Sequence, residues 1–525
     1  MPWSGCGLYS LDPDGMPPGP ARRRGIATKR RLLRMRVRAA ALSPMAVSAD
    51  VLAVPIYRED REFPADLADL DATSGGVISG AIDWGEFNLL EHYTALVDAG
   101  SLPSQKLLLV NGVRRGRGAW RARRIASTAV RRLQGRGATT LALWLRDGED
   151  EDAFAAAIVG AQQGTYRPTS IYGRVRDTEA MKRSVEELIL LGGPSQEAVD
   201  RAVLLAEGVE FGRTLANRAS NDLFPERMAD VARQLEADGC TVEVLGPPEM
   251  AALGMNALLG VGQGAEHEPR LIAVKLPGWD KRPDRRLAIV GKGVCFDSGG
   301  ISLKPPERME EMKHDKSGAA AVIAAARTVA RLAPDTPLMA VAPMVENMPG
   351  ANAQRPGDVV KAMNGKTVEV VNTDAEGRLI LIDALHWAER EGATHLVDVA
   401  TLTGAASVAF GELISPYFAK PREWGTAVQA AGDATGEWLW EMPLATEYRT
   451  SLDSAHADIV NSGSREGALI KSAVFINDFV TVPWVHMDIA GTAYLLSDRS
   501  WNPKGALGTG VSTLTRLSLD YAAGR

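Results

Sequence analysis

Cysteine and histidine are scarce in this chain, and their spacing excludes the usual sites built from them. The 525 residues include three cysteines, Cys6, Cys240 and Cys295, which are odd in number and far apart. They predict neither a disulfide framework nor a CxxC motif and fit a reducing compartment best. The seven histidines never stand at HExxH or HxxxH spacing. A bound metal would therefore be held mainly by carboxylates.

Long apolar stretches are also missing. No run of about 18 apolar residues without charge occurs, so the sequence predicts no membrane span. With 45% hydrophobic and 24% charged residues, the composition is typical of a soluble globular protein, which excludes wholesale disorder, collagen and coiled coil. At about 100–200 residues per domain, the chain has room for two to four domains.

The first 45 residues are strongly basic. They contain nine Lys and Arg residues against two Asp, so this stretch carries +7 and the remainder −13. Its opening, rich in Pro and Gly, and Pro44 in its later apolar run argue against a targeting signal. We predict a disordered basic extension over 1–45, or a functional start at Met45, because the first strand-like run, VLAVPIY, begins only at 51. A chain that begins at Met45 is expected to keep its activity and oligomeric mass.

Apolar strand-like runs alternate with helical patterns from 51 to about 180, which is typical of an α/β layer with a parallel or mixed sheet. The segment 196–217 has apolar residues at helical spacing behind Ser195, which predicts a connecting helix. A second α/β domain follows. We therefore expect a basic extension (1–45), an N-terminal α/β domain (46–190), a connecting helix (191–220) and a C-terminal domain (221–525).

Nine arginines crowd the segment 114–136, which would suit a nucleic-acid site. The same segment has an apolar stripe formed by Ile125, Ala129, Val130 and Leu133, as a surface helix would. Arginine is preferred throughout, since only fourteen of the 59 basic residues are lysine. We interpret the segment as a helix with a solvated basic face, which argues against nucleic acid as a partner.

The region 287–379 carries the chemistry. A buried-strand pattern, LAIV at 287–290, runs into glycine-rich sequence that holds Lys292, Asp297 and Lys304. Open α/β sheets usually place their ligand site at such a strand-to-loop exit. The GKG sequence lacks the spacer and trailing Lys-Ser/Thr of a P-loop and is not GxGxxG, so it indicates phosphate binding only weakly.

Further acids follow in the same region. Asp315 precedes an Ala-rich helical run, where it could serve merely as an acid at a helix N-terminus. A strand at 368–371 breaks at Asn372, and Asp374, Glu376 and Arg378 stand at the junction with the next helix, from which they can project into one cleft. These acids with an arginine and two lysines exceed what helix caps require.

The motif NTDAEGRL at 372–379 stands unaltered as the signature of the leucyl (cytosol) aminopeptidases, two-metal exopeptidases that this sequence resembles. The stretch 291–322, DVATLTGA at 398–405 and the later segments SREGALIKSAVF and WVHMDIAGTAY are similar to that family as well. The resemblance covers 195–515, is looser over 50–190 and has no counterpart in 1–45. Departures such as Cys295 and Leu469-Ile470-Lys471 fall outside the liganding positions and bear on pocket shape.

The resemblance implies an α/β fold with a macro-domain-like N-terminal domain and a catalytic domain whose mixed sheet lies between helices. It further implies a cytoplasmic homo-hexamer made of two trimers. The implied activity is metal-dependent release of N-terminal leucine and similar apolar residues from peptides with a free N-terminus, by a metal-bridged hydroxide.

The family's site residues carry over by position. One divalent ion, Zn²⁺ or Mn²⁺, would be held by Asp297, Asp374 (also through its backbone carbonyl) and Glu376. The second would be held by Lys292, as a neutral amine, with Asp297, Asp315 and Glu376. Two cations carry +4, which four carboxylates neutralise, and paired ions of this kind activate a shared water. The remaining implied roles are oxyanion stabilisation by Lys304, a bicarbonate ion at Arg378, and a substrate pocket lined by Met312, Thr401 and Gly404. Asp488 we assign to structure.

Two alternatives stay open from the residues themselves. The spacing of the acids alone would permit another co-catalytic metallohydrolase, such as a dipeptidase or an aminoacylase, although NTDAEGRL argues against it. A non-enzymatic alternative is a DNA-binding accessory protein, since some relatives with this catalytic domain also have that role.

Overall fold

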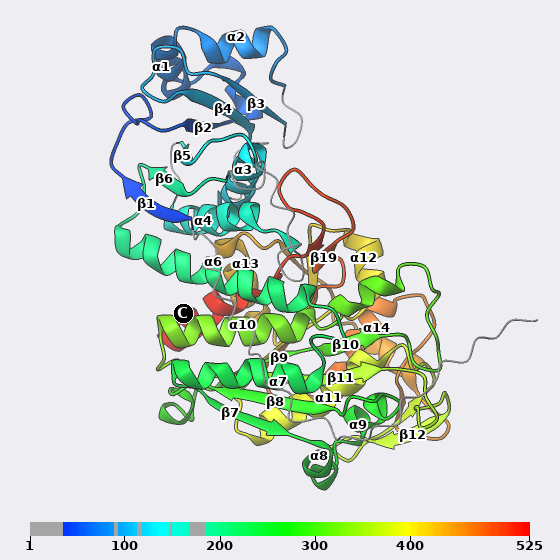
Figure 1. The fold of residues 1–525 in the computed structure, drawn as a ribbon. Coiled ribbons are helices and arrows are strands. Elements are labelled where there is room, and N and C mark those ends of the chain that lie inside the picture. Colours follow the sequence, from blue (N-terminus) through cyan, green and yellow to red (C-terminus); the bar gives the residue numbers. More distant parts are fainter. Residues whose placement is uncertain (1–34, 89–92, 113–117, 147–149, 169–183) are drawn as a thin grey trace, which may run out of the picture. The chain divides into compact units, whose positions relative to one another are not determined.

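Two mixed β-sheets, each covered by helices, organise the chain (Figure 1). The computed structural model describes residues 35–88, 93–112, 118–146, 150–168 and 184–525. Arg114, Arg115, Arg117 and most of the basic extension lie outside the described residues. The α/β fold class expected from the sequence is confirmed. Among the described residues, no helix combines the length and apolarity needed to cross a membrane.

The N-terminal sheet has six strands in the order β1-β6-β5-β2-β4-β3, and all its neighbouring pairs are parallel except β3 with β4. Its strands are β1 (Arg36–Ala40), β2 (Val51–Ile56), β3 (Thr94–Asp98), β4 (Lys106–Asn111), β5 (Thr140–Trp144) and β6 (Glu187–Leu191). Its helices are η1 (Arg58–Glu62), α1 (Ala65–Ser74), α2 (Val77–Asp83), α3 (Gly118–Leu133) and α4 (Glu151–Thr165). The strand-like runs that we identified at 51, 106 and 140 are strands.

Strand β1 corrects one prediction. Residues 36–40, which we assigned to a disordered extension, pair in parallel with β6 over five residues, from Arg36 opposite Glu187 to Ala40 opposite Leu191. Arg38 Nε also donates to Glu187 Oε1 at 2.9 Å. The arginines of this segment made it look like part of the basic extension. Charged residues are nevertheless common on edge strands, and β1 is one. The prediction of an unstructured segment is wrong for 36–40, and a start at Met45 would remove β1.

The arginines of α3 correct a second prediction. Arg121, Arg123 and Arg124 are buried rather than solvated. Arg123 donates to Gln163 Oε1 at 2.9 Å and to the carbonyl of Thr435 at 3.3 Å. The Arg124 guanidinium lies 4.0 Å from the ring centroid of Trp501. The basic face of α3 therefore packs against segments that belong to the C-terminal half of the chain, and for these three arginines a solvated face is wrong.

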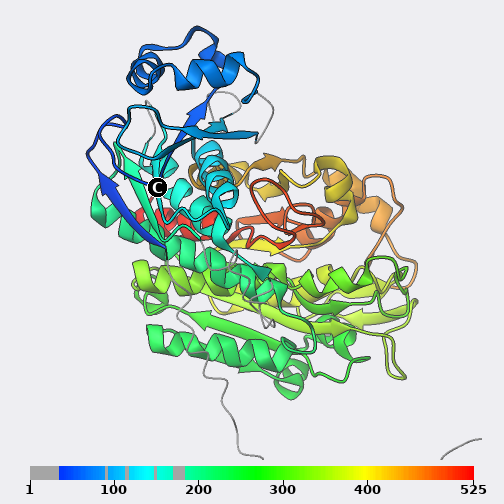
Figure 2. The ribbon, with the colours of Figure 1, turned by 45° about the horizontal axis from the view of Figure 1, so that its top comes forward.

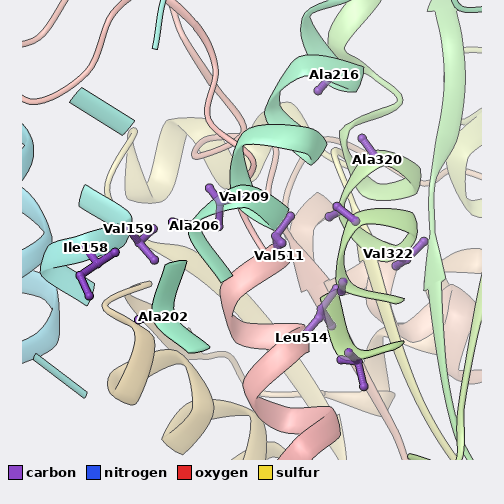
Figure 3. Close-up of a cluster of buried hydrophobic side chains, with 14 of the residues drawn as sticks. Ile158, Val159, Ala202, Ala206, Val209, Ala216, Ala320, Val322, Val511 and Leu514 are labelled. Atoms are coloured by element: carbon purple, nitrogen blue, oxygen red, sulfur yellow. The ribbon is translucent and has the colours of Figure 1, made fainter. Parts of the chain in front are cut away.

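Helix α6 (Gln196–Asn217) connects the two halves, as the sequence predicted. Ser195 caps it by accepting from the amide of Ala198 at 3.2 Å. In Figure 1 it runs between α4 and α10, and Figure 3 shows Val209, Ala320 and Leu514 in the apolar core beside it. The helices pack closely, since a Cβ at Gly208 would lie 2.0 Å from Thr328 Oγ1.

The second sheet has nine strands in the order β16-β15-β18-β14-β9-β11-β8-β7, with β10 paired to β11. Figure 2 shows green strands of this sheet between green helices. Its strands are β7 (Thr241–Leu245), β8 (Arg270–Lys275), β9 (Leu287–Gly291), β10 (Gly293–Asp297), β11 (Leu338–Asn347), β14 (His395–Ala400), β15 (Ser415–Lys420), β16 (Leu439–Glu441) and β18 (Trp484–Asp488). Strands β18, β14, β9 and β11 run parallel to one another. They are almost wholly buried, because helices cover both faces of the sheet.

Helices and two small sheets complete the C-terminal part. The helices are α7 (Pro225–Arg233), η3 (Gln234–Asp238), α8 (Pro247–Leu253), α9 (Asn256–Gly262), η4 (Trp279–Lys281), η5 (Met309–His314), α10 (Ser317–Leu332), α11 (Glu376–Arg390), α12 (Gly404–Phe410), α13 (Arg422–Thr435), η6 (Thr446–Leu452), α14 (Ala468–Asn477) and α15 (Val511–Ala523). The small sheets are formed by β12 (Asp358–Lys361), β13 (Thr367–Val370) and β17 (Ile459–Val460), and by β19 (Tyr494–Leu495) and β20 (Gly505–Ala506).

Candidate active site

Polar residues gather where the parallel strands of the nine-stranded sheet end. Lys292 follows β9, Asp297 ends β10, Asn347 ends β11, Thr401 follows β14 and Asp488 ends β18. The carboxyl ends of parallel strands lie at one edge of a sheet, which is the usual ligand edge of open α/β folds. The sheet thus brings together residues that lie up to about two hundred positions apart in the sequence.

Two loops cover this edge and are fastened to each other. Thr373 Oγ1 donates to the carbonyl of Gly299 at 2.6 Å and accepts from the amide of Ser302 at 2.8 Å. The amide of Thr373 in turn donates to Ser302 Oγ at 3.1 Å. Gly299 and Gly300 have φ values of +87° and +66°, which L-residues with side chains rarely adopt. These bonds hold the NTDAEGRL segment against the loop after β10.

Three carboxylates converge between these loops. Asp297, Asp374 and Glu376 each offer an oxygen within 4.8 Å of the others, a grouping that could hold a metal ion. Lys304 Nζ lies 2.7 Å from Asp297 Oδ2 and also forms an ion pair with Asp374. The three residues proposed for one ion are therefore neighbours, with Lys304 beside them.

Lys292 joins the remaining candidate ligands. Its Nζ lies 2.7 Å from Glu376 Oε1 and 2.9 Å from Asp315 Oδ2, and it donates to the carbonyl of Thr401 at 3.0 Å. Glu376 thus contacts Lys292 and belongs to the carboxylate group with Asp297. All five residues that the resemblance assigned to metal binding lie in one connected cluster.

The electrostatics of the cluster fit divalent cations. Four carboxylates face two ammonium groups, which leaves a formal excess of two negative charges. Burial raises the pKa of Asp315, Asp374 and Glu376, with neighbouring carboxylates adding to the effect. Burial lowers the pKa of Lys292, but the carboxylates of Asp315 and Glu376 outweigh it and raise the value above normal.

Two buried carboxylate oxygens also indicate whether this cluster suits a metal ion. Asp315 Oδ2 and Glu376 Oε1 accept no hydrogen bond of regular geometry from the described residues, although both lie at ion-pair distance from Lys292. Buried oxygen acceptors without regular partners, in a set with excess negative charge, form a donor set that suits hard divalent cations. The residues present therefore fit a metal centre.

Arg378 is buried beside this cluster, on the first turn of α11. Its Nη1 donates to the carbonyl of Asn461 at 2.6 Å and its Nη2 to Ser472 Oγ at 2.7 Å. Burial lowers the pKa of Arg378 to about 10, against the opposing charges of Glu376 and Asp488. Its Nε is buried and makes no hydrogen bond to the described residues. A guanidinium with a free buried donor is suited to hold a small anion.

The three residues assigned to the substrate pocket differ in their surroundings. Thr401 is buried, and its Oγ1 donates to Asp315 Oδ1 at 2.7 Å, so it also positions a candidate ligand. Gly404 is exposed at the start of α12, and Met312 is half-buried in η5. Asp488 accepts from Thr403 Oγ1 at 2.7 Å, which anchors the loop 401–404.

Sequence reasoning missed the amide side chains that orient these groups. Asn347 Nδ2 donates to Asp297 Oδ1 at 2.8 Å and to the carbonyl of Thr373 at 3.0 Å. Asn461 contacts both the NTDAEGRL segment and Arg378. Two polar residues, Glu346 and Asn347, end an otherwise apolar strand, which was a usable signal for Asn347. Asn461 lies nearly ninety residues from its partners and gave none.

Comparison with known proteins decides the family. Residues 210–515, more than half of the chain, match the catalytic domain of the cytosol aminopeptidase family. The chain belongs to the cytosol aminopeptidase family. The resemblance drawn from NTDAEGRL is confirmed, and the chain is a hydrolase of this metal-dependent aminopeptidase family.

Relatives of this aminopeptidase are similar over almost their full length. A probable cytosol aminopeptidase of Solibacter usitatus (strain Ellin6076) is 44% identical over 485 residues, 91% of this chain and 98% of the relative. One from Geobacter sp. (strain M21) is 38% identical over 93% of this chain and 99% of the relative. Among solved structures, a tomato leucine aminopeptidase mutant matches with a TM-score of 0.81 and 30% identity over 93% of this chain and 96% of that one.

A further solved structure adds a metal to the comparison. The bottromycin maturation enzyme BotP in complex with Mn matches with a TM-score of 0.76 and 32% identity, over 90% of this chain and all of that one.

Proposed function

We propose that this aminopeptidase binds two divalent ions, Zn²⁺ or Mn²⁺, and removes leucine and similar apolar residues from the free N-terminus of peptides. The observation that carries the proposal is the cluster in which Lys292, Asp297, Asp315, Asp374 and Glu376 converge with excess negative charge. The manganese complex of BotP supports the metal assignment. When bound, the two ions would supply a shared hydroxide and an electrophilic contact for the scissile carbonyl.

The ligand assignment follows the neighbours found in the cluster. Asp297, Asp374 and Glu376 would hold one ion; Lys292 and Asp315, with Asp297 and Glu376 as shared ligands, would hold the other. Thr401 fixes Asp315 through its hydroxyl, and Asn347 fixes Asp297 through its amide. These hydrogen bonds orient the carboxylates before any ion arrives, which is how groups around a metal site tune affinity.

Lys304 and Arg378 supply positive charge beside the reacting centre. Lys304 Nζ lies against Asp297 and Asp374, and we assign it the stabilisation of negative charge on the carbonyl oxygen. Arg378 stays protonated, so it is not the base itself. Arg378, whose buried Nε makes no hydrogen bond to the described residues, would hold a bicarbonate ion, which would supply a proton acceptor and donor between the attacking water and the leaving amine.

The substrate assignment rests on the family and on the three residues assigned to the substrate pocket. If the α-amine of the substrate binds one of the metal ions, only peptides with a free N-terminus would react. Met312, Thr401 and Gly404 would form the pocket for the first side chain. We further propose a cytoplasmic homo-hexamer of two trimers, with residues 36–190, which include β1, and 221–525 as two domains joined by α6.

Chelation and reconstitution test the proposal. Hydrolysis of Leu-p-nitroanilide should fall at least a hundredfold when the enzyme is stripped of metal and should return on addition of Mn²⁺ or Zn²⁺. A peptide-library profile with each metal restored should favour N-terminal Leu and Met. Undiminished hydrolysis by the stripped enzyme would contradict the metal assignment, and cleavage within N-terminally blocked peptides would contradict the aminopeptidase assignment.

A further inference from the structure

Asn461 is a fully buried amide whose hydrogen bonds converge on the segment that carries Asp374. It follows β17. Its Oδ1 accepts from the amide of Val371 at 2.9 Å and from the amide of Asn372 at 3.2 Å. Its Nδ2 donates to the carbonyl of Asn372 at 2.7 Å and to that of Ala375 at 3.4 Å. Both the amide oxygen and the amide nitrogen of Asn461 therefore form hydrogen bonds to the same stretch of five residues, 371–375.

The backbone of Asn461 reaches two other parts of the site. Its carbonyl accepts from Arg378 Nη1 at 2.6 Å, and its amide donates to the carbonyl of Glu369 in β13 at 3.0 Å. One residue is thus bonded to the strand before the turn, to the turn itself and to the guanidinium after it. Asn461 therefore ties the turn that carries Asp374 to the Arg378 guanidinium.

The other contacts of the turn come from elsewhere in the site. The amide of Asp374 donates to Asn372 Oδ1 at 2.9 Å, and Thr373 bonds to the loop at 299–302 and accepts from Asn347 Nδ2 at 3.0 Å. Without the Asn461 side chain, the amides of Val371 and Asn372 would lose the acceptor that holds them in place and would have to turn to water instead. The turn would then relax towards water, and Asp374 would move relative to Arg378.

We propose that Asn461 is a positioning residue for catalysis: it sets the turn 371–375 and the Arg378 guanidinium in one fixed relation. The inference rests on the proposed function, in which Asp374 binds metal and Arg378 holds the proton-carrying anion. It predicts that Asn461 acts on metal affinity and on kcat while leaving substrate contacts in place.

Asn217 provides a matched control. It is also a buried asparagine that joins distant segments, since its Nδ2 donates to the carbonyls of Arg213 and Ala506 and its Oδ1 accepts from the amide of Ala506. It lies at the end of α6, outside the cluster. Asn217→Ala should therefore lower stability comparably without touching the ligand turn.

The experiment compares Asn461→Ala, Asn217→Ala and wild type in three measurements. These are amide hydrogen exchange of residues 369–378 in the metal-free full chain, the Kd for Mn²⁺ by calorimetry, and kcat and KM for Leu-p-nitroanilide at saturating Mn²⁺. If Asn461→Ala does not fold, Asn461→Asp serves instead. Its shape is the same, but its second oxygen opposes the carbonyls of Asn372 and Ala375.

Asn461→Ala should show faster exchange across 371–375, a Kd for Mn²⁺ weaker by roughly 10–100-fold, a kcat at least tenfold lower and an almost unchanged KM. Asn217→Ala should match wild type in all of these. Equal exchange, metal affinity and kcat in Asn461→Ala and Asn217→Ala would overturn the proposal. A wild type that binds no Mn²⁺ would instead refute the proposed function, and the exchange measurement would still report whether Asn461 holds the turn.

Discussion

Lys292 Nζ lies 2.7 Å from Glu376 Oε1, so a lysine that the family assigns to metal binding is paired with a carboxylate assigned to the same ion. An ammonium has no lone pair, and coordination requires the proton to leave an amine with an ordinary pKa of about 10.4. Arginine cannot follow this path because its guanidinium stays protonated. We predict that Lys292→Arg loses one metal ion per chain.

The matched variant is Lys304→Arg, which alters the other lysine of the cluster. Since Lys304 is assigned to charge stabilisation, this variant should keep both ions and lose about 10²–10³-fold in kcat. Metal counting by plasma mass spectrometry on both purified proteins checks the pair of predictions. Two ions retained in Lys292→Arg would remove Lys292 from the ligand set.

Gly377 offers an independent test of the same side chain. A Cβ at this position would lie 2.7 Å from Lys292 Cε and 2.8 Å from Lys292 Nζ, closer than van der Waals contact allows. Gly377→Ala should displace the amine and lower kcat at least tenfold, measured with Leu-p-nitroanilide. Gly80→Ala is the control, because a Cβ there meets nothing within 4 Å. Equal rates for the two variants would show that Lys292 can move without consequence.

Truncation tests strand β1. Removal of residues 1–44 deletes the strand paired with β6 and exposes the backbone edge of that sheet, whereas a chain that begins at Met35 keeps it. We predict that the Met45 form unfolds at a temperature lower by more than about 5 °C or aggregates. Thermal unfolding with size-exclusion chromatography of both forms provides the measurement. Identical behaviour would mean that β1 contributes nothing to stability.

Asp383 should give the fold a pH-dependent stability. Burial raises its pKa to about 7, although it accepts from the amides of Met363 at 2.8 Å and Leu258 at 2.9 Å. Its unfolded pKa is about 3.9. Between these values the folded state binds more protons than the unfolded state, so this contribution to stability is present at low pH and is lost as pH rises towards 7.

Urea unfolding of the metal-free protein at pH 5 and pH 8 checks this. Wild type should lose stability relative to Asp383→Asn across that range, by roughly 1–3 kcal/mol. Parallel pH profiles for the two proteins would show that Asp383 titrates normally in the folded state.

Local pattern predicted much of the fold. Helix α6 was predicted from its periodicity and the cap at Ser195, and strands β2, β4 and β5 from short apolar runs. Strand β1 was missed because it lies within the basic stretch: the alternation Arg36-Val37-Arg38 is typical of an edge strand but too short to stand out there. Helix α3 was placed, but its amphipathic pattern does not reveal whether the polar face meets water or another part of the chain. Arg123 and Arg124 meet the C-terminal half.

The site, too, could be predicted from the sequence only in part. The motif around Asp374, Glu376 and Arg378 indicated the family directly, because it is contiguous in sequence. The partners that orient it, Asn347 and Asn461, come from other strands and depend on the folded topology. The pairing of Lys292 with Glu376 and of Lys304 with Asp297 likewise follows from side-chain positions that no sequence spacing specifies.

The most direct test of the account is the requirement for a free α-amine. The Mn²⁺-loaded enzyme should be given Leu-Gly and acetyl-Leu-Gly at equal concentration, with release of leucine or acetyl-leucine followed by chromatography. We predict rapid hydrolysis of Leu-Gly and none of acetyl-Leu-Gly, because acetylation removes the amine that would bind the metal centre. Comparable hydrolysis of the two would contradict this prediction and would indicate an acylase or an endopeptidase.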